Sequence, residues 1–198
     1  MSENETTTRR ARPGRPRAEG VDERILRAAL NQLARVGYDA MSIAAVAAEA
    51  GVTKPTLYRR WSSKEDLVTS AVSTLATTGP EEAASDGWEA LLGELQAFHR
   101  AISRPQGIAL VGNVLALEQR HPHLIELFRR KVASARRSRL RYVLNSAQSS
   151  GIIRPDADIE VVIDMLIGYY YSARVGGGAI DDGWPGRCIA LIRQGLQQ

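Results

Sequence analysis

The sequence contains little that could cross-link the chain or anchor it in a membrane. Cys188 is its one cysteine, so neither an intramolecular disulfide nor a zinc site built on paired thiols can form, and a lone cysteine fits a reducing compartment. Residues 108–117 form the longest apolar stretch, well short of the roughly 18 residues that a membrane span requires. The N-terminal arginines are not followed by the apolar run of a secretory signal. We therefore expect a soluble, cytoplasmic protein.

The motifs of several common enzyme classes are absent as well. The sequence has no glycine-rich phosphate loop, no GxSxG nucleophile elbow and no HExxH pair. Two of its 3 histidines, His121 and His123, flank a proline. No third ligand lies near them in sequence, so the pair indicates the start of a helix rather than a metal site. We expect no metal, no cofactor and no enzymatic activity.

What is present is an ordinary globular composition with an uneven charge. Apolar residues make up 44% and charged residues 24% of the chain, which excludes a disordered or collagen-like protein. Residues 1–67 contain 12 Lys and Arg against 9 Asp and Glu, a net charge of +3, whereas residues 68–198 contain 14 against 13. The basic bias of the first part suits an anionic partner.

An arginine-rich segment precedes the first predicted helix. Residues 9–17 read RRARPGRPR, with two prolines and a glycine that prevent a helix and almost nothing apolar to bury. Such a segment is either a solvated tail or an arm that lies along DNA with arginines in the minor groove. In the second interpretation Arg15 and Arg17 contact DNA.

Two helices are predicted to open the folded part. Apolar residues at helical spacing over residues 21–36 predict the first helix, and Gly37 stands where a C-terminal glycine belongs. Ser42 can cap a second, short helix, which ends at Gly51. Glycine at this position permits the positive φ of a tight turn.

Two more helices follow directly. Thr53 can cap the third, and Pro55 then lies in its first turn, where the missing N–H costs nothing. The run SSKE at residues 62–65 is a capping box that opens a fourth helix over residues 63–76. The second and third helices, joined through a glycine turn, form a helix-turn-helix.

The stretch over residues 41–68, MSIAAVAAEAGVTKPTLYRRWSSKEDLV, resembles the N-terminal DNA-binding domain of TetR-family transcriptional regulators. Two positions depart from the family pattern: Trp61 replaces the commoner phenylalanine, and Pro55 replaces a small residue at the start of the recognition helix. The resemblance implies an all-α fold in which a flexible basic arm, a helix-turn-helix domain and a helical effector-binding and dimerisation domain span residues 1–20, 21–67 and 68–198.

We expect the third helix to read DNA. The first turn of a recognition helix enters the major groove, and here it contains Lys54 and Thr56. Tyr58 offers a hydroxyl to a phosphate oxygen, and Ser42 caps its helix against another, while Arg59 is equally consistent with a solvated charge. The resemblance implies DNA contacts for several of these positions. The full set that we expect to bind DNA is Arg15, Arg17, Ser42, Thr53, Lys54, Pro55, Thr56, Tyr58, Arg59, Arg60 and Lys64.

The chain after residue 67 is near neutral and helical. Residues 77–80 form a linker, after which the spacing predicts helices, with no persistent strand alternation, over residues 86–103, 107–119, 122–149, 156–175 and 184–197. The helix over residues 156–175 is apolar most of the way round, so one of its covers is expected to be another subunit. The resemblance implies the same, since the last two helices of the family form a four-helix bundle across a homodimer.

A ligand site in the second domain is implied by the resemblance, because effector pockets of the family lie among the middle helices. Candidate lining residues, for which ordinary core packing is the alternative, are Trp88, Phe98, His99, Asn113, Tyr169 and Tyr170. A basic run over residues 129–141 is typical of a solvated face, although it could also bind an acidic effector or DNA.

Together these patterns indicate a homodimeric, sequence-specific DNA-binding transcriptional regulator. One short recognition helix in each subunit predicts a palindromic operator with half-sites about one helical turn apart, or a multiple of it. The resemblance implies a repressor that a small-molecule effector releases from double-stranded DNA. Two alternatives remain: a constitutive DNA-binding protein without a ligand switch, and an enzyme with an incidental helix-turn-helix, against which the missing catalytic motifs argue.

Overall fold

Helices make up every regular element in the described part of the chain. The computed structural model describes residues 19–77 and 87–196, and no strand occurs in those two ranges, which confirms the predicted all-α class. Arg15, Arg17 and the predicted linker beyond Thr77 lie outside the described residues. No helix within the described ranges is long and apolar enough to cross a membrane.

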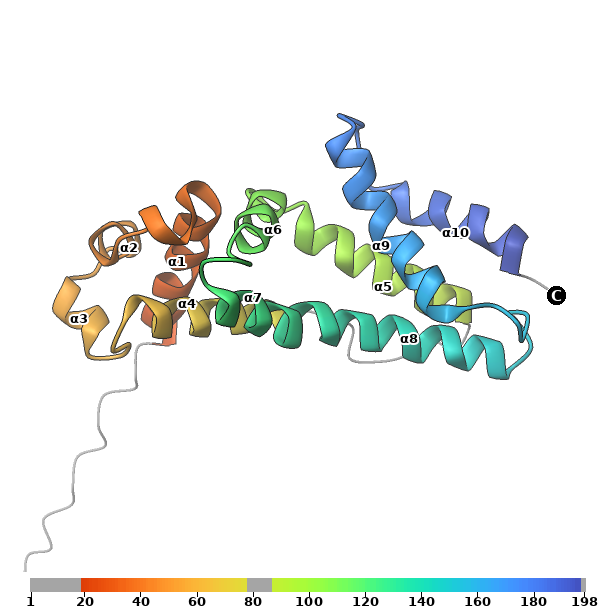
Figure 1. The fold of residues 1–198 in the computed structure, drawn as a ribbon, viewed down its shortest axis with the longest axis horizontal. Coiled ribbons are helices and arrows are strands. Elements are labelled where there is room, and N and C mark those ends of the chain that lie inside the picture. The colour runs from red at the N-terminus through yellow and green to blue at the C-terminus, as the bar shows by residue number, and fades with distance from the viewer. Residues whose placement is uncertain (1–18, 78–86, 197–198) are drawn as a thin grey trace, which may run out of the picture.

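The N-terminal half lies at one end of an elongated molecule (Figure 1). It consists of α1 (Glu19–Ala40), α2 (Ile43–Ala50), α3 (Lys54–Tyr58), α4 (Lys64–Ser73) and the 3-10 turn η1 (Thr74–Thr77). The chain leaves the helical conformation at Gly37, whose φ is +75°, as the sequence predicts. The last residues of α1 therefore form a separate turn after a kink.

The C-terminal half contains the remaining elements. They are α5 (Gly87–Ile102), α6 (Gly107–Leu115), α7 (Pro122–Phe128), the π-helical segment η2 (Arg129–Ala133), α8 (Ser134–Ser149), α9 (Ile159–Val175) and α10 (Trp184–Leu196). In Figure 1, α7 and α8 run along the length of the molecule, while α9 and α10 lie at the end opposite α3. The prediction of one uninterrupted α-helix over residues 122–149 is wrong, because η2 replaces one α-helical turn by a wider π turn.

The predicted caps of α2 and α3 are confirmed. The Ser42 hydroxyl accepts a hydrogen bond from the backbone N–H of Ala45 at 3.1 Å, and the Thr53 hydroxyl accepts one from that of Thr56 at 3.4 Å. Gly51 ends α2 with a φ of +66°, in the left-handed region that favours glycine. These local interactions set the helix-turn-helix geometry.

The cap of α4 lies one residue later than predicted. Ser63 Oγ accepts from the N–H of Asp66 at 3.0 Å, and the Asp66 carboxylate accepts from the N–H of Ser62 at 2.9 Å. The predicted box over residues 62–65, with Glu65 as its acid, is therefore wrong by one position. Two adjacent serines followed by two adjacent acids fit either register, and the sequence motif alone does not distinguish them.

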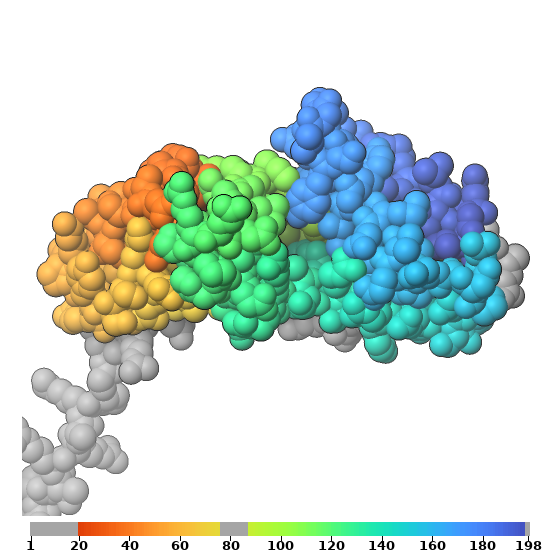
Figure 2. Space-filling model, viewed as in Figure 1, coloured from red at the N-terminus to blue at the C-terminus, as the bar shows by residue number. Residues whose placement is uncertain are grey.

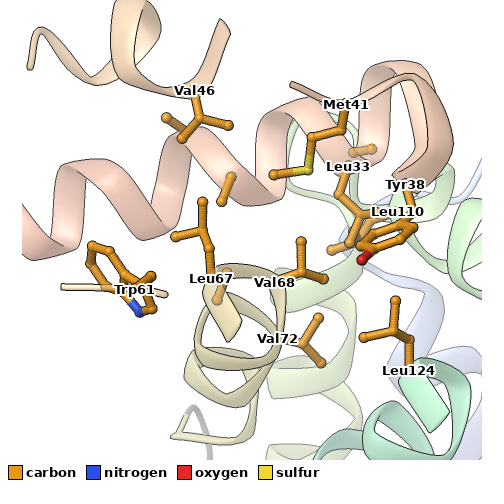
Figure 3. Close-up of a cluster of buried hydrophobic side chains, with 14 of the residues drawn as sticks. Leu33, Tyr38, Met41, Val46, Trp61, Leu67, Val68, Val72, Leu110 and Leu124 are labelled. Carbon is orange, nitrogen blue, oxygen red and sulfur yellow. The ribbon is translucent and has the colours of Figure 1, made fainter. Parts of the chain in front are cut away.

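One hydrophobic core joins the N-terminal half to α6 and α7. Figure 3 shows Val68 and Val72 of α4 between the side chains of α1 and Leu124 of α7, with Leu110 of α6 on the same side. Leu67 of α4 is fully buried in this core. The α4 helix contacts both α1 and α7, so it connects the N-terminal helices to the C-terminal half.

A second core fills the space among α5, α8, α9 and α10. It contains aliphatic side chains such as Leu95, Leu144 and Ile163, which are almost completely buried, together with an aromatic group around Trp184. The α5 helix packs against both α8 and α10, so it is the central element of this half.

Candidate functional site

One buried residue anchors the third helix, and most of its other side chains are exposed. Leu57 is completely buried, whereas Tyr58 beside it keeps 53% of its surface. Exposed residues at this end of the molecule include Ser42, Thr53, Lys54, Pro55, Tyr58 and Arg59, and Thr56 is half-buried with its hydroxyl 3.0 Å from that of Thr53. The structure thus brings most of the expected DNA-contacting residues together on α3, with Ser42 at the first turn of α2.

A carboxylate that the sequence analysis did not identify holds α2 against α1. Glu49 on α2 accepts hydrogen bonds from Gln32 Nε2 at 2.7 Å and Asn31 Nδ2 at 2.9 Å, and Arg35 lies 3.6 Å away. Gln32 is buried among the apolar residues of α1. A buried polar side chain of this kind is hydrogen-bonded, so a glutamine at an inward-facing helix position was the available signal.

Two of the expected cations, Arg60 and Lys64, form contacts with other residues of the chain. Arg60 forms an ion pair with Asp22 on α1 and donates to the Thr56 carbonyl at 3.1 Å. Lys64 Nζ donates to the Tyr38 carbonyl at 2.8 Å and lies 4.4 Å from the centre of the Tyr38 ring. Lys64 therefore stabilises the C-terminal end of α1, where positive charge is favoured.

Histidine–carboxylate contacts join the two halves. Asp39 at the end of α1 lies 2.9 Å from His121 Nε2 and accepts from Arg120 at 3.0 Å. These bonds, that from His121 first, hold the pKa of Asp39 below its ordinary value. His123 lies 3.0 Å from Glu65 on α4. Both histidines at the start of α7 thus contact carboxylates, and the described residues contain no group of three metal-ligating side chains.

A surface hollow of about 660 Å³ lies where α1 meets α6. Asn113 contributes to its lining, and Asn113 Nδ2 donates to the Ala34 carbonyl at 2.7 Å. Asn113 therefore connects α6 to α1. The structure does not place it with the aromatic residues among which the sequence analysis grouped it.

Four of the expected ligand residues do share one core. The ring centres of Phe98 and Tyr170 are 5.2 Å apart, that of His99 is 6.0 Å from Tyr170, and Trp88 belongs to the same cluster. Trp184 is nearly completely buried, with its ring 5.3 Å from that of Tyr170. Trp184 stands at a predicted helix start next to glycine and proline, where a surface turn is expected, so its burial is not predictable from the sequence.

Polar contacts run through this aromatic group. The two ring nitrogens of His99 lie 3.1 Å from Asp182 and 3.2 Å from the Ser103 hydroxyl, which is 3.2 Å from the Tyr170 hydroxyl. Tyr169, the remaining expected ligand residue, is half exposed and stacks against Trp184 with ring centres 6.2 Å apart. The region is thus apolar and aromatic with a few placed polar groups, a composition typical of small-molecule sites.

Two protein-family models match the chain, and they correspond to the two halves of the structure. The model described as bacterial regulatory proteins, tetR family, matches residues 25–71. The model described as tetracyclin repressor-like, C-terminal domain, matches residues 86–192.

Full-length relatives show the same similarity. The HTH-type transcriptional regulator YdeS of Bacillus subtilis is 27% identical over 186 residues, which cover 93% of either chain. The DNA-binding transcriptional repressor TetR of Mycobacteroides abscessus is 28% identical over 91% of this chain and 98% of its own length. Among solved structures, the TetR family transcription regulator SCO0332 aligns with a TM-score of 0.60 at 27% identity, covering 91% of this chain and all of that one.

Proposed function

The chain belongs to the TetR family of bacterial regulatory proteins, and from that membership we propose that it is a homodimeric repressor which a small-molecule ligand releases from a palindromic operator. We propose that it acts in the cytoplasm and is a regulator rather than an enzyme, and the regulator and repressor names of its relatives support the second part. We assign DNA binding to residues 21–67, preceded by the basic arm, and effector binding and dimerisation to residues 68–198.

The exposed face of α3 is the observation that carries this proposal. Leu57 anchors a helix of only five residues, so its remaining side chains are available to a partner. Lys54 and Thr56 at the first turn are assigned to base edges, and Tyr58 and Ser42 to phosphates. Arg60 and Lys64 contribute by fixing α3 and α4 to α1, through the contacts with Asp22 and Tyr38.

An exposed apolar stripe on the last two helices supports dimerisation. Val161, Met165 and Tyr169 follow one another at four-residue spacing on α9, and each keeps half or more of its surface exposed. Leu191 on α10 is 76% exposed. Exposed apolar residues of this kind mark a protein interface, and a second copy of the chain can cover them.

The shared core supports coupling between ligand and DNA. A ligand shifts the DNA-binding equilibrium only by its difference in affinity for the two states, and about 1–3 kcal/mol changes operator affinity roughly 5- to 150-fold. The α4 helix packs in the same core as α6 and α7, so it is the element that transmits this difference.

Gel shift with the DNA upstream of the protein's own gene tests the DNA-binding proposal. We expect salt-sensitive binding to one fragment that contains a palindrome, with an unrelated fragment of equal length as the control. Failure to bind any upstream fragment would contradict the proposal.

A small-molecule screen tests the ligand switch separately. Compounds that raise the unfolding temperature are added to the preformed DNA complex, and at least one is expected to dissociate it. If the protein binds DNA but every stabilising compound leaves the complex intact, the protein is a constitutive DNA-binding protein and the switch is refuted.

A further inference from the structure

Arg136 differs from every other arginine in the basic run over residues 129–141. The others each contact a carboxylate within 3.5 Å, and they are Arg129, Arg130, Arg137, Arg139 and Arg141. Arg136 forms no hydrogen bond or ion pair with any described residue, and its Nη1 atom is buried. Its guanidinium carbon lies 5.1 Å from the centre of the Phe98 ring. The guanidinium thus points into the second core without a direct carboxylate contact, because Glu94, whose charge also acts on it, is paired with Arg139.

A second buried donor without an acceptor lies beside the same ring. Trp184 Nε1 has no hydrogen-bond partner among the described residues, and the Trp184 and Phe98 ring centres are 6.0 Å apart. Arginine and tryptophan nitrogens are donors only. The donors of Arg136 and Trp184 therefore each require an acceptor, because buried polar groups in folded proteins are rarely left without a hydrogen-bond partner.

The charges of the neighbouring side chains indicate that this acceptor is negatively charged. Arg139, one turn from Arg136, pairs with Glu94 at 3.1 Å, and Glu94 is buried, so these two charges neutralise each other. Tyr171 stays neutral, since burial raises the pKa of its hydroxyl. One positive charge, that of Arg136, remains unbalanced, and the planar guanidinium matches a carboxylate in shape and hydrogen-bond geometry.

We propose that the effector of this protein is a small organic carboxylate with an aromatic or aliphatic body, whose acid group pairs with Arg136 among α5, α8 and α9. This inference rests on the proposed ligand switch and specifies its chemistry. The apolar body packs against Phe98 and the neighbouring rings, and Trp184 Nε1 donates to an oxygen of the ligand. Figure 2 shows the surface recessed between α6 and α9, with α5 visible behind.

The position of Arg136 also connects the ligand to the DNA-binding half. Arg136 lies three residues after the π-helical segment η2, which contacts both α4 and η1. A π turn inside an α-helix is a frequent feature of functional sites. A carboxylate that draws Arg136 toward it therefore acts on the helix that carries η2, and through η2 on α4.

Matched acids and amides test the inference. Phenylacetate, naphthaleneacetate and hexanoate are each added at millimolar concentration beside the corresponding primary amide, which has nearly the same shape but no charge. We expect the best acid to raise the unfolding temperature of the full chain by about 2–4 °C, and its amide to have little effect. Calorimetry then gives the dissociation constant of that acid.

Variants assign the effect to Arg136. R136Q is expected to weaken the acid about 10- to 100-fold and to abolish the preference for acid over amide, whereas R100Q, which removes an exposed arginine of α5, retains it. R136M, which keeps much of the side-chain volume, is expected to unfold without ligand at the same temperature as the wild type or a higher one, because it removes an unpaired buried charge.

The outcomes separate this inference from the function on which it rests. Equal shifts by acids and amides, no shift by any acid, or full acid preference in R136Q would each overturn the carboxylate assignment. The gel shift on upstream DNA needs no ligand. A protein that binds its operator but fails the acid test therefore refutes this inference alone, whereas loss of operator binding refutes the proposed function.

Discussion

The two halves of the molecule differ in how completely their polar groups are paired. Around α3, Glu49 and Lys64 form several hydrogen bonds that fix α2 and α4 against α1, and Asp66 caps its own helix. In the C-terminal core, by contrast, Arg136 and Trp184 keep buried donors without acceptors among the described residues. The difference supports our proposal that the N-terminal half holds one fixed geometry to read DNA and that the C-terminal half receives an effector.

The exposed surfaces of the halves differ in the same sense. The exposed residues of α3 include the cationic Lys54 and the hydroxyl-bearing Tyr58, whereas Val161, Met165 and Tyr169 form an exposed apolar stripe on α9. A polar, basic face suits DNA phosphates and base edges, and an apolar face suits a second copy of the chain. Each of the following substitutions alters one of the two halves and leaves the other unchanged.

The largest expected effect is loss of the α3 anchor. Leu57→Ala removes a completely buried side chain and should lower the free energy of unfolding by about 2–5 kcal/mol, measured by urea denaturation. Tyr58→Ala, the matched exposed neighbour, should change that energy by less than about 0.5 kcal/mol. Equal destabilisation by the two variants would contradict the division between anchor and contact residue.

The next effect concerns the apolar stripe. Met165→Asp places a charge on a side chain that is 60% exposed in one chain, so the monomer should fold normally while dimerisation weakens roughly 30-fold or more. Sedimentation at a series of concentrations measures this change. Tyr142→Asp, on an exposed apolar residue of α8, is the control and should leave the dimer intact. A fully dimeric Met165→Asp variant would place the interface elsewhere.

A smaller effect is expected from a single DNA contact. Tyr58→Phe removes the hydroxyl that we propose donates to a phosphate, and operator affinity should fall about 10- to 100-fold while dimerisation is unchanged. Fluorescence anisotropy with a labelled operator measures the affinity. Wild-type affinity in this variant would show that the hydroxyl does not contact DNA.

The smallest effect is acid sensitivity at the surface of the C-terminal half. Arg141, and after it Arg137, lower the pKa of Glu160 from 4.5 to about 2. A depressed carboxylate pKa stabilises the fold above the unfolded-state value, and this contribution is lost as the pH falls from 4.5 to about 2. Glu160→Gln should therefore flatten the fall in unfolding temperature within that window. Glu89→Gln, on an exposed residue of α5, should leave it unchanged.

Much of the N-terminal half is predictable because its determinants are local. Ser42, Gly51 and Thr53 act within a few residues, so cap and turn chemistry identify α2 and α3 with their correct starts. The predicted cap of α4 is wrong by one residue, because two registers of the capping box fit the sequence equally well. Only the position of Asp66 in space distinguishes them. Lys64 also escapes local reasoning, since its partners lie in α1, more than twenty residues earlier.

The C-terminal half is less predictable because its determinants are tertiary. Residues 129–141 form one basic run in sequence, and helical spacing gives no reason to single out Arg136. The π turn of η2 precedes Arg136 and changes the helical register of the residues that follow it. Arg136 faces the core, whereas Arg137 contacts Glu160 on the outside. Asn113 likewise was grouped with the aromatic residues, although α6 places it against Ala34 of α1.

We propose that DNA reading by α3 depends on dimerisation through α9 and α10, and a single measurement tests this dependence. The measurement is the affinity of the wild-type protein for the full palindromic operator relative to one half-site at the same salt concentration. Because the dimer joins two recognition helices, we expect the palindrome to bind about 100-fold more tightly or better. Equal affinity for the palindrome and the half-site would contradict the account.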